Sequence, residues 1–213
     1  MIAYVGQTRS RTLIARLAAL GLGELVVRGE LPARRRPFAY DNGCYRDWRA
    51  GVAFNVTRWT RDLRWMLYRG IVPDFVVVPD IVAGGLASLE WSAFWRDTVP
   101  TEFAAYLAVQ DGMTEADVVP ELRRYQGVFV GGSLAWKLAT GGAWAKLARR
   151  RGLRCHIGRV GTAARVHWAR AVGATSIDSA LPLRAAEHLA AFIAALGAAA
   201  EPAPGRRDVA HAG

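Results

Sequence analysis

Four polar residues of this sequence stand at the ends of short apolar runs. Asp41 ends the run Phe-Ala-Tyr-Asp, Asp80 follows Phe-Val-Val-Val-Pro, Gln110 ends Ala-Tyr-Leu-Ala-Val-Gln, and Asp178 follows Ser-Ile. A carboxylate in such a place is partly desolvated, so it needs a partner. Each residue alone is equally well explained as a turn former or a helix cap. Together they predict one polar site that contains three carboxylates and an amide.

Asp80 and Gln110 carry the functional groups needed to bind the edge of a guanine-like base. A carboxylate accepts two hydrogen bonds, from N1–H and from the amino group, while a glutamine amide donates to O6. Backbone N–H groups at Gly131 and Gly132 would reinforce the O6 contact, because glycine lets the backbone approach a planar ligand closely. His156 is expected to line the same pocket, although a lone histidine is often a satisfied structural residue.

Two groups of residues are candidates for binding phosphate. Arg34, Arg35 and Arg36 form a basic run that would either clamp a nucleic-acid backbone or remain a solvated loop. The segment from Gly158 through Arg159 to Gly161 follows an apolar run and precedes a helical pattern. Free N–H groups at a helix N-terminus favour phosphate, so we expect a nucleotide phosphate there.

Short runs rich in Val, Ile, Phe and Tyr alternate with longer stretches of helical spacing, which is typical of repeated βα units around a parallel sheet. The strands are expected at residues 2–5, 24–27, 38–41, 75–79, 105–110, 127–131, 154–157 and 175–178. The main helices are expected at residues 57–69, 88–96, 115–124, 142–151, 162–172 and 183–196. Eight strands in this alternation predict a (β/α)8 TIM-type barrel, in which reactive groups project from the C-terminal strand ends.

The link between the second and third expected strands is too short for a full helix, so an incomplete or distorted barrel is an alternative. We find no repeat and no composition break, so residues 1–197 are predicted to form a single domain. Residues 198–213 lack periodicity and are rich in Ala, Pro and Gly, which predicts a disordered tail.

Composition restricts the function classes further. The chain has 213 residues and a net charge of +10, and an excess of positive charge raises affinity for polyanions; Arg-rich solvated helix faces explain it equally well. No stretch is apolar enough to span a membrane, and the N-terminus does not read as a secretory signal, so we expect a cytoplasmic protein. Cys44 and Cys155 are the only cysteines, so they are expected to be thiols, with no CxxC-type zinc site.

An ordered set of motifs resembles the tRNA-guanine transglycosylase (queuine tRNA-ribosyltransferase) superfamily. The resemblance covers residues 41–182 and is greatest to the small members that place 7-deazaguanines in DNA. The motifs are DNG at Asp41, PD at Asp80, AVQDG around Gln110, VGG at Gly131, IGRVGT from Ile157 and SIDSALP around Asp178.

This resemblance implies roles for the strand-end residues. Asp178 matches the family's nucleophile, which attacks C1′ and forms a covalent glycosyl-enzyme intermediate. Asp41 matches the general acid and base at the exchanging purine, and Asp80, Gln110, Gly131 and Gly132 match the base-binding positions. The family's three-Cys, one-His zinc site and its tRNA-specific insertions are missing, which moves the expected acceptor from tRNA to DNA.

The expected function is therefore the exchange of guanine in DNA for a 7-deazaguanine such as 7-cyano-7-deazaguanine, with no cofactor and no metal. Two alternatives remain open: the same exchange on tRNA or on a free nucleotide, and a non-catalytic nucleic-acid-binding barrel. The sequence also leaves open which 7-deazaguanine is used, and whether the chain acts alone, as a homodimer or with partner subunits.

Overall fold

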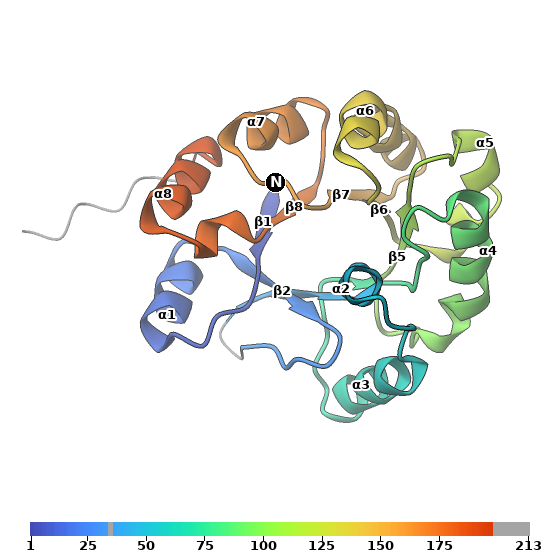
Figure 1. Cartoon of the computed structure of the whole chain (residues 1–213), viewed down its shortest axis with the longest axis horizontal. Helices are drawn as coiled ribbons and strands as arrows, with labels where there is room; N and C mark the ends of the chain where they lie inside the picture. Colours follow the sequence, from blue (N-terminus) through green and yellow to red (C-terminus); the bar gives the residue numbers. More distant parts are fainter. Residues whose placement is uncertain (34–35, 198–213) are drawn as a thin grey trace, which may run out of the picture.

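The computed structural model describes residues 1–33 and 36–197, which form a closed barrel of eight parallel strands inside a ring of helices (Figure 1). The strands are neighbours in chain order, and β1 pairs with β8 to close the sheet. This arrangement confirms the predicted (β/α)8 TIM-type barrel. The expected tail, residues 198–213, lies outside the described residues.

All eight predicted strands are present. They are β1 (Ile2–Val5), β2 (Gly23–Val27), β3 (Phe38–Asp41), β4 (Val76–Val77), β5 (Ala105–Val109), β6 (Gly127–Val130), β7 (Arg154–Ile157) and β8 (Ser176–Ser179). The fourth strand is shorter than expected because Pro79 has no N–H to contribute to a ladder.

Helices follow most of the strands and form the outer layer. They are α1 (Arg11–Ala19), α2 (Cys44–Ala50), α3 (Val56–Tyr68), α4 (Gly85–Trp95), α5 (Glu115–Val118), α6 (Leu134–Arg150), α7 (Ala163–Ala171) and α8 (Ala186–Ala195). None of these described helices is long and apolar enough to cross a membrane. The two cysteines are buried free thiols, as expected.

Three helical regions differ from the sequence prediction. The helix expected at residues 115–124 is divided into α5 and a 3-10 turn (Leu122–Arg124), because Pro120 lies between them and interrupts helical hydrogen bonding. Helix α6 begins at Leu134, well before the predicted start, because the Ser133 side chain caps it by accepting the Trp136 N–H. Helices α1 and α2 were not expected, and α2 lies over the barrel opening (Figure 1).

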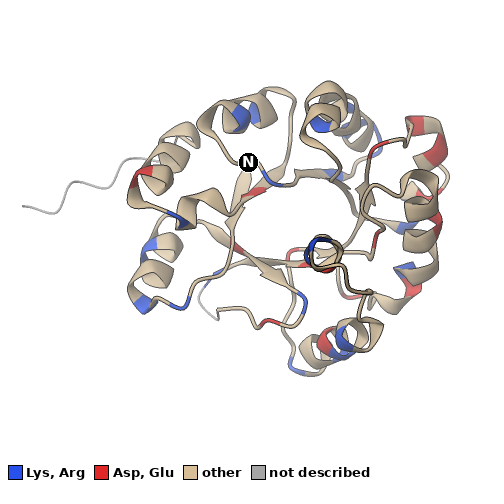
Figure 2. Cartoon of the chain, viewed as in Figure 1, with Lys and Arg blue, Asp and Glu red and all other residues tan. Residues whose placement is uncertain are grey.

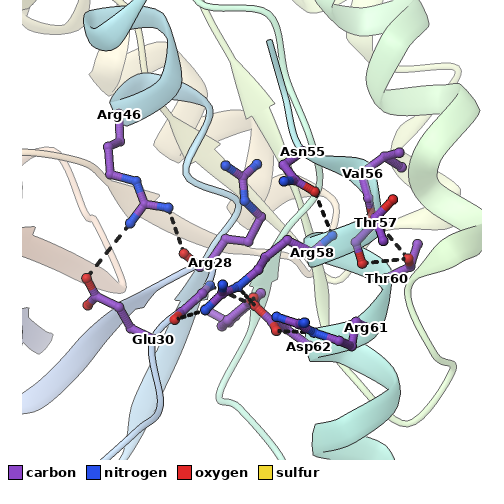
Figure 3. A network of polar contacts seen from close by, with 12 residues as sticks. Arg28, Glu30, Arg46, Asn55, Val56, Thr57, Arg58, Thr60, Arg61 and Asp62 are labelled. Atoms are coloured by element: carbon purple, nitrogen blue, oxygen red, sulfur yellow. Dashed lines mark hydrogen bonds and ion pairs between the residues drawn. The ribbon is translucent and has the colours of Figure 1, made fainter. Parts of the chain in front are cut away.

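The link between β2 and β3 contains no helix in its described residues, as its length predicted. Side chains from neighbouring helices hold this link instead (Figure 3). Gly29 donates its N–H to Asp62 of α3 at 2.7 Å, and Arg58 donates to the Gly29 carbonyl. Arg46 of α2 donates to the Arg28 carbonyl at 2.7 Å. The start of the loop is therefore fixed to two helices, which compensates for the missing helix.

The lower part of the barrel interior is filled by aromatic rings. Phe75 stacks on Tyr106 with ring centroids 4.2 Å apart, and it meets Tyr4 edge-on at 5.6 Å. Glycines on the adjacent strands make room for these rings, because a Cβ at Gly23 or Gly127 would lie 2.5 Å from the ring of Tyr4 or Tyr106. This aromatic layer fills the interior below the C-terminal strand ends and separates the cavity there from a smaller one, of about 520 Å³, among the segments that lead into β4, β5, β6 and β7.

Replacing Gly127 with alanine should therefore destabilise the fold. The added methyl group would overlap the Tyr106 ring, and overpacking of this kind costs about 1–3 kcal/mol. The matched control is Gly142→Ala in α6, where the nearest atom is 3.6 Å away and loss of a helical glycine should be neutral or slightly stabilising. Urea unfolding of both variants measures the difference, and equal midpoints would contradict this account of the interior.

Candidate functional site

A cavity of about 970 Å³ opens at the C-terminal ends of the strands. Its lining combines residues that are far apart in the sequence, from the ends of all eight strands or the loops that directly follow them. Seven of the predicted site residues line it: Asp41, Asp80, Gln110, Gly131, Gly132, Arg159 and Asp178. The structure thus brings together both proposed catalytic carboxylates and most of the proposed base-binding residues.

Asp178 belongs to β8 and lines the cavity, but it is only 5% exposed. Its Oδ1 atom accepts the Arg159 backbone N–H at 3.1 Å and is 3.0 Å from His156 Nε2. Gly158 lies against the same oxygen, because a Cβ there would be 3.4 Å from Oδ1. A buried carboxylate is costly unless it is hydrogen-bonded, and these donors supply that stabilisation.

His156 does not reach the cavity. Its side chain is fully buried, and it is not among the cavity-lining residues. Nδ1 is 2.9 Å from Ser176 Oγ, and the ring stacks on Phe129 with centroids 4.8 Å apart. The expectation that His156 lines the pocket is therefore wrong, because strand β7 directs this ring beneath the cavity floor. The alternative interpretation, a satisfied buried histidine, fits its position.

Asp41 ends β3, three strands round the barrel from β8, and accepts the Gly43 backbone N–H at 2.6 Å. Burial raises the pKa of the Asp41 carboxyl to about 6, the Gly43 N–H lowers it, and the negative charge of Asp178 raises it further. A carboxyl group with this pKa exchanges protons readily near neutral pH. Asp41 is thus electrostatically suited to proton transfer, whereas Asp178 is surrounded by hydrogen-bond donors.

Asp80 is held between two side-chain amides. Asn42 donates to Asp80 Oδ1 at 2.7 Å, and Gln110 donates to Oδ2. Both amides are fixed in orientation, because Asn42 Oδ1 accepts the Cys44 N–H and Gln110 Oε1 accepts the Ala83 N–H, each at 2.7 Å. Burial raises the pKa of Asp80 to about 7, and the Asn42 amide opposes that rise.

The Gly131-Gly132 segment follows β6 and passes close to a neighbouring loop. Gly132 has a φ of 73°, a conformation that favours glycine, and a Cβ there would collide with the Asp111 carboxylate. Asp111 in turn accepts the Ser133 N–H at 2.7 Å and the Ser133 hydroxyl at 2.6 Å. Gly132 is therefore required by the backbone path at the cavity wall, whereas the close approach of a planar ligand to both glycines remains a prediction.

Arg159 adopts a φ of 57°, which is uncommon for a residue with a side chain. Its guanidinium donates to the Gly132 carbonyl at 2.9 Å and lies over the Tyr45 ring, 4.1 Å from the centroid. Arg159 thus connects the loop after β7 to the loop after β6 and to helix α2, beside the cavity. Of the three residues predicted to bind phosphate here, only Arg159 lines the cavity; Gly158 and Gly161 do not.

Lys137 supports the same loop from α6. This buried lysine donates from Nζ to the Gly158 carbonyl at 2.6 Å. Burial lowers the pKa of Lys137 to about 8, the Arg159 charge lowers it further, and the Asp178 charge opposes both. The sequence gives no signal for this role, because a lysine in a helix is normally expected to face solvent.

Arg36 is not available to a phosphate. It is buried, and its guanidinium lies 3.4 Å from the Glu24 carboxylate, with both side chains almost fully covered. The prediction of a phosphate contact by Arg36 is therefore wrong, because this guanidinium neutralises a buried glutamate beneath the β2–β3 link. Arg34 and Arg35 lie outside the described residues.

Several residues at this site were not predicted as functional. They include Asn42, Lys137 and Ser176, to which no function was assigned from the sequence. Their contacts follow from tertiary neighbours rather than from local sequence patterns. Within residues 1–33 and 36–197, no cluster of three or more His, Cys, Asp or Glu side chains has the arrangement of a metal site.

These features define a TIM-type barrel with a polar, carboxylate-rich cavity at the C-terminal strand ends. Comparison of the sequence with protein-family models and with curated proteins gave no match. The site is therefore interpreted from its own geometry.

The raised pKa values of Asp41 and Asp80 predict how stability depends on pH. Their pKa values in the folded protein, about 6 and about 7, exceed the ordinary aspartate value of about 4. At pH values between the ordinary and the raised pKa, the folded protein therefore binds more protons than the unfolded chain. This contribution to the unfolding free energy falls as pH rises from about 4 to 7. Asp41→Asn should reduce the change in unfolding free energy between about pH 5 and about pH 8 by on the order of 1 kcal/mol. Urea unfolding across this range measures it.

The control for this measurement is Asp97→Asn, which removes a carboxylate that is 84% exposed and paired with Arg124 on the surface. It should retain the pH dependence of the unaltered protein. A slope that Asp41→Asn leaves unchanged would contradict the raised pKa of Asp41.

Proposed function

We propose that the protein is a transglycosylase that exchanges guanine in DNA for a 7-deazaguanine base through a covalent aspartyl intermediate. The observation that carries this proposal is that Asp178 and Asp41 face one cavity that also contains the Asp80–Gln110 pair. A nucleophilic carboxylate, a proton-transfer carboxylate and a purine-reading pair are the groups that base exchange requires. The resemblance of the ordered motifs to the tRNA-guanine transglycosylase superfamily supports the same reaction.

Base recognition is assigned to Asp80 and Gln110. In the free site the Gln110 amide donates to Asp80, so it occupies a place where a base N–H would donate. A guanine-like base would replace that amide with its own N1–H and amino group, and the released Gln110 amide would donate to O6. The Gly132 backbone N–H would complete the O6 contact, whereas the Gly131 N–H expected to share in it is donated to the Val109 carbonyl at 2.9 Å. A base without these donors would displace the Gln110 amide from Asp80 Oδ2 without replacing its hydrogen bond, which disfavours the binding of such a base.

The first half of the reaction removes guanine. A carboxylate oxygen of Asp178 forms a bond to C1′ while the C1′–N9 bond breaks and its electron pair passes to the purine. Protonated Asp41 donates its proton to the departing guanine, for which its pKa of about 6 is well placed. The oxocarbenium-like transition state gains stabilisation from the nearby negative charge.

The second half reverses these steps with the new base. Asp41, now ionised, accepts the N9 proton of the 7-deazaguanine, and N9 attacks C1′. The bond between C1′ and Asp178 breaks, its electron pair returns to the carboxylate, and both aspartates recover their starting states. The chain's own carboxylates thus account for every proton and electron pair in the exchange.

Positive charge supports DNA as the acceptor. The net charge is +10, and lysines and arginines occur on helices around much of the ring, while acidic residues are frequent on the side of α4 and α5 (Figure 2). Such a surface attracts a polyanion through counterion release. Arg159, beside Asp178 at the cavity, is the described residue we assign to phosphate contact.

Direct exchange assays test the function and its acceptor. The protein is incubated with 7-cyano-7-deazaguanine and either guanine-containing DNA, tRNA or a guanosine mononucleotide, and the digested nucleosides are analysed by mass spectrometry. We expect the deazaguanine nucleoside from DNA. Exchange on tRNA or mononucleotide alone would change the acceptor, and salt-sensitive binding to DNA without any exchange would favour a non-catalytic nucleic-acid-binding barrel.

Two variants separate attack from base recognition. Asp178→Ala should abolish the trapped protein–DNA adduct and slow exchange at least about 1000-fold, because the nucleophile is lost. Asp80→Ala should chiefly raise the KM for the base, by about 10–100-fold, because the base loses its hydrogen bonds to a charged group. Gel analysis of the adduct and steady-state kinetics measure both effects, with Asp97→Ala on the surface as the control. An adduct that survives Asp178→Ala would place the nucleophile elsewhere.

A further inference from the structure

We infer that His156 is a positioning residue that anchors Oδ1 of Asp178 and leaves Oδ2 as the oxygen that attacks C1′. The attack of Oδ2 on C1′ is a step of the proposed function, so this part of the inference rests on that proposal. Its structural part, the orientation of the nucleophile by a buried histidine, is testable without any exchange.

The contacts of the ring define its tautomer. Asp178 Oδ1 lies 3.0 Å from His156 Nε2, and because a carboxylate only accepts hydrogen bonds, Nε2 must carry a proton. In the Nε2–H tautomer, Nδ1, which is 2.9 Å from Ser176 Oγ, accepts the Ser176 hydroxyl proton. The order Ser176, His156, Asp178 forms a chain of hydrogen bonds that ends on the proposed nucleophile.

The two oxygens of Asp178 have unequal surroundings. Oδ1 receives both the His156 Nε2–H and the Arg159 backbone N–H, whereas no hydrogen bond from the described residues reaches Oδ2. A carboxylate oxygen that already accepts two hydrogen bonds is a weaker nucleophile than its free partner. Since Asp178 lines the cavity, Oδ2 is the oxygen left to form the bond to C1′.

The surroundings of His156 prevent the ring from turning. Phe129 stacks on it with an interplanar angle of 15°, and the rings of Phe75 and Tyr4 approach at 5.0 and 5.9 Å between centroids. The imidazole is fully buried, so water does not compete for its N–H. An aromatic cage of this kind fixes the direction of the Nε2–H bond, which in turn fixes the plane of the Asp178 carboxylate.

Substitutions of His156 test this role, because they should slow the attack on C1′ without changing the affinity for the base. His156→Phe keeps an aromatic ring but removes the donor, so adduct formation in a single turnover should slow about 10–100-fold while the affinity for the free base is unchanged. His156→Gln carries an amide N–H of similar reach and should recover most of the rate. An adduct formed at the original rate by His156→Phe, or a glutamine variant no faster than the phenylalanine variant, would overturn the inference.

Nitrogen NMR of the imidazole provides a test that does not depend on activity or on either variant folding. In the free protein we expect the Nε2–H tautomer of His156, with a signal that shifts in Asp178→Ala because the acceptor is gone. A ring protonated only at Nδ1, or one insensitive to Asp178→Ala, would overturn the inference. If no acceptor yields an adduct with the unaltered protein, the proposed function fails, while the NMR result still decides whether His156 holds Asp178.

Discussion

Closure of the parallel sheet, through the pairing of β1 with β8, is the constraint on which the rest of the molecule depends. In a closed barrel of parallel strands every second side chain points inward, and all C-terminal ends meet at one rim. Aromatic rings fill the lower interior, where Gly23 and Gly127 make space for them. Near the rim, polar residues such as Asp41, Asp80, Gln110 and Asp178 converge beside a few apolar ones, and a cavity opens there rather than a packed core.

Convergence places three carboxylates, Asp41, Asp80 and Asp178, around one cavity, which is electrostatically unfavourable. The molecule manages this cost differently at each position. Asp178 accepts hydrogen bonds from the His156 ring and from the Arg159 backbone N–H. Asp80 accepts hydrogen bonds from two side-chain amides whose orientation is fixed. Asp41 accepts one backbone N–H, and burial raises the pKa of its carboxyl to about 6; burial also raises the pKa of Asp80, to about 7, in spite of its two amide donors. The three carboxylates thus differ in their hydrogen-bond partners, and our proposed division of attack, recognition and proton transfer starts from that difference.

The irregular link between β2 and β3 shows how a barrel tolerates a missing helix. Its first residues are tied to α2 and α3 through Arg46, Arg58 and Asp62 (Figure 3), and Arg36 neutralises the buried Glu24 farther along. Arg36 is therefore a structural counter-ion even though it belongs to a basic run that suggested phosphate binding. Local charge patterns do not distinguish these roles, because burial and partners are properties of the folded chain.

The sequence by itself determined the strand order, the single barrel and the strand-end positions of Asp41, Asp80, Gln110 and Asp178, because apolar periodicity and chain order suffice for a repeated βα fold. Only the tertiary structure decided which neighbours each residue meets. It placed His156 beneath the floor rather than in the pocket, paired Arg36 with Glu24, and brought Lys137 to the Gly158 carbonyl. Those outcomes depend on contacts between segments distant in sequence, where side-chain direction and burial are set by packing that no local pattern records.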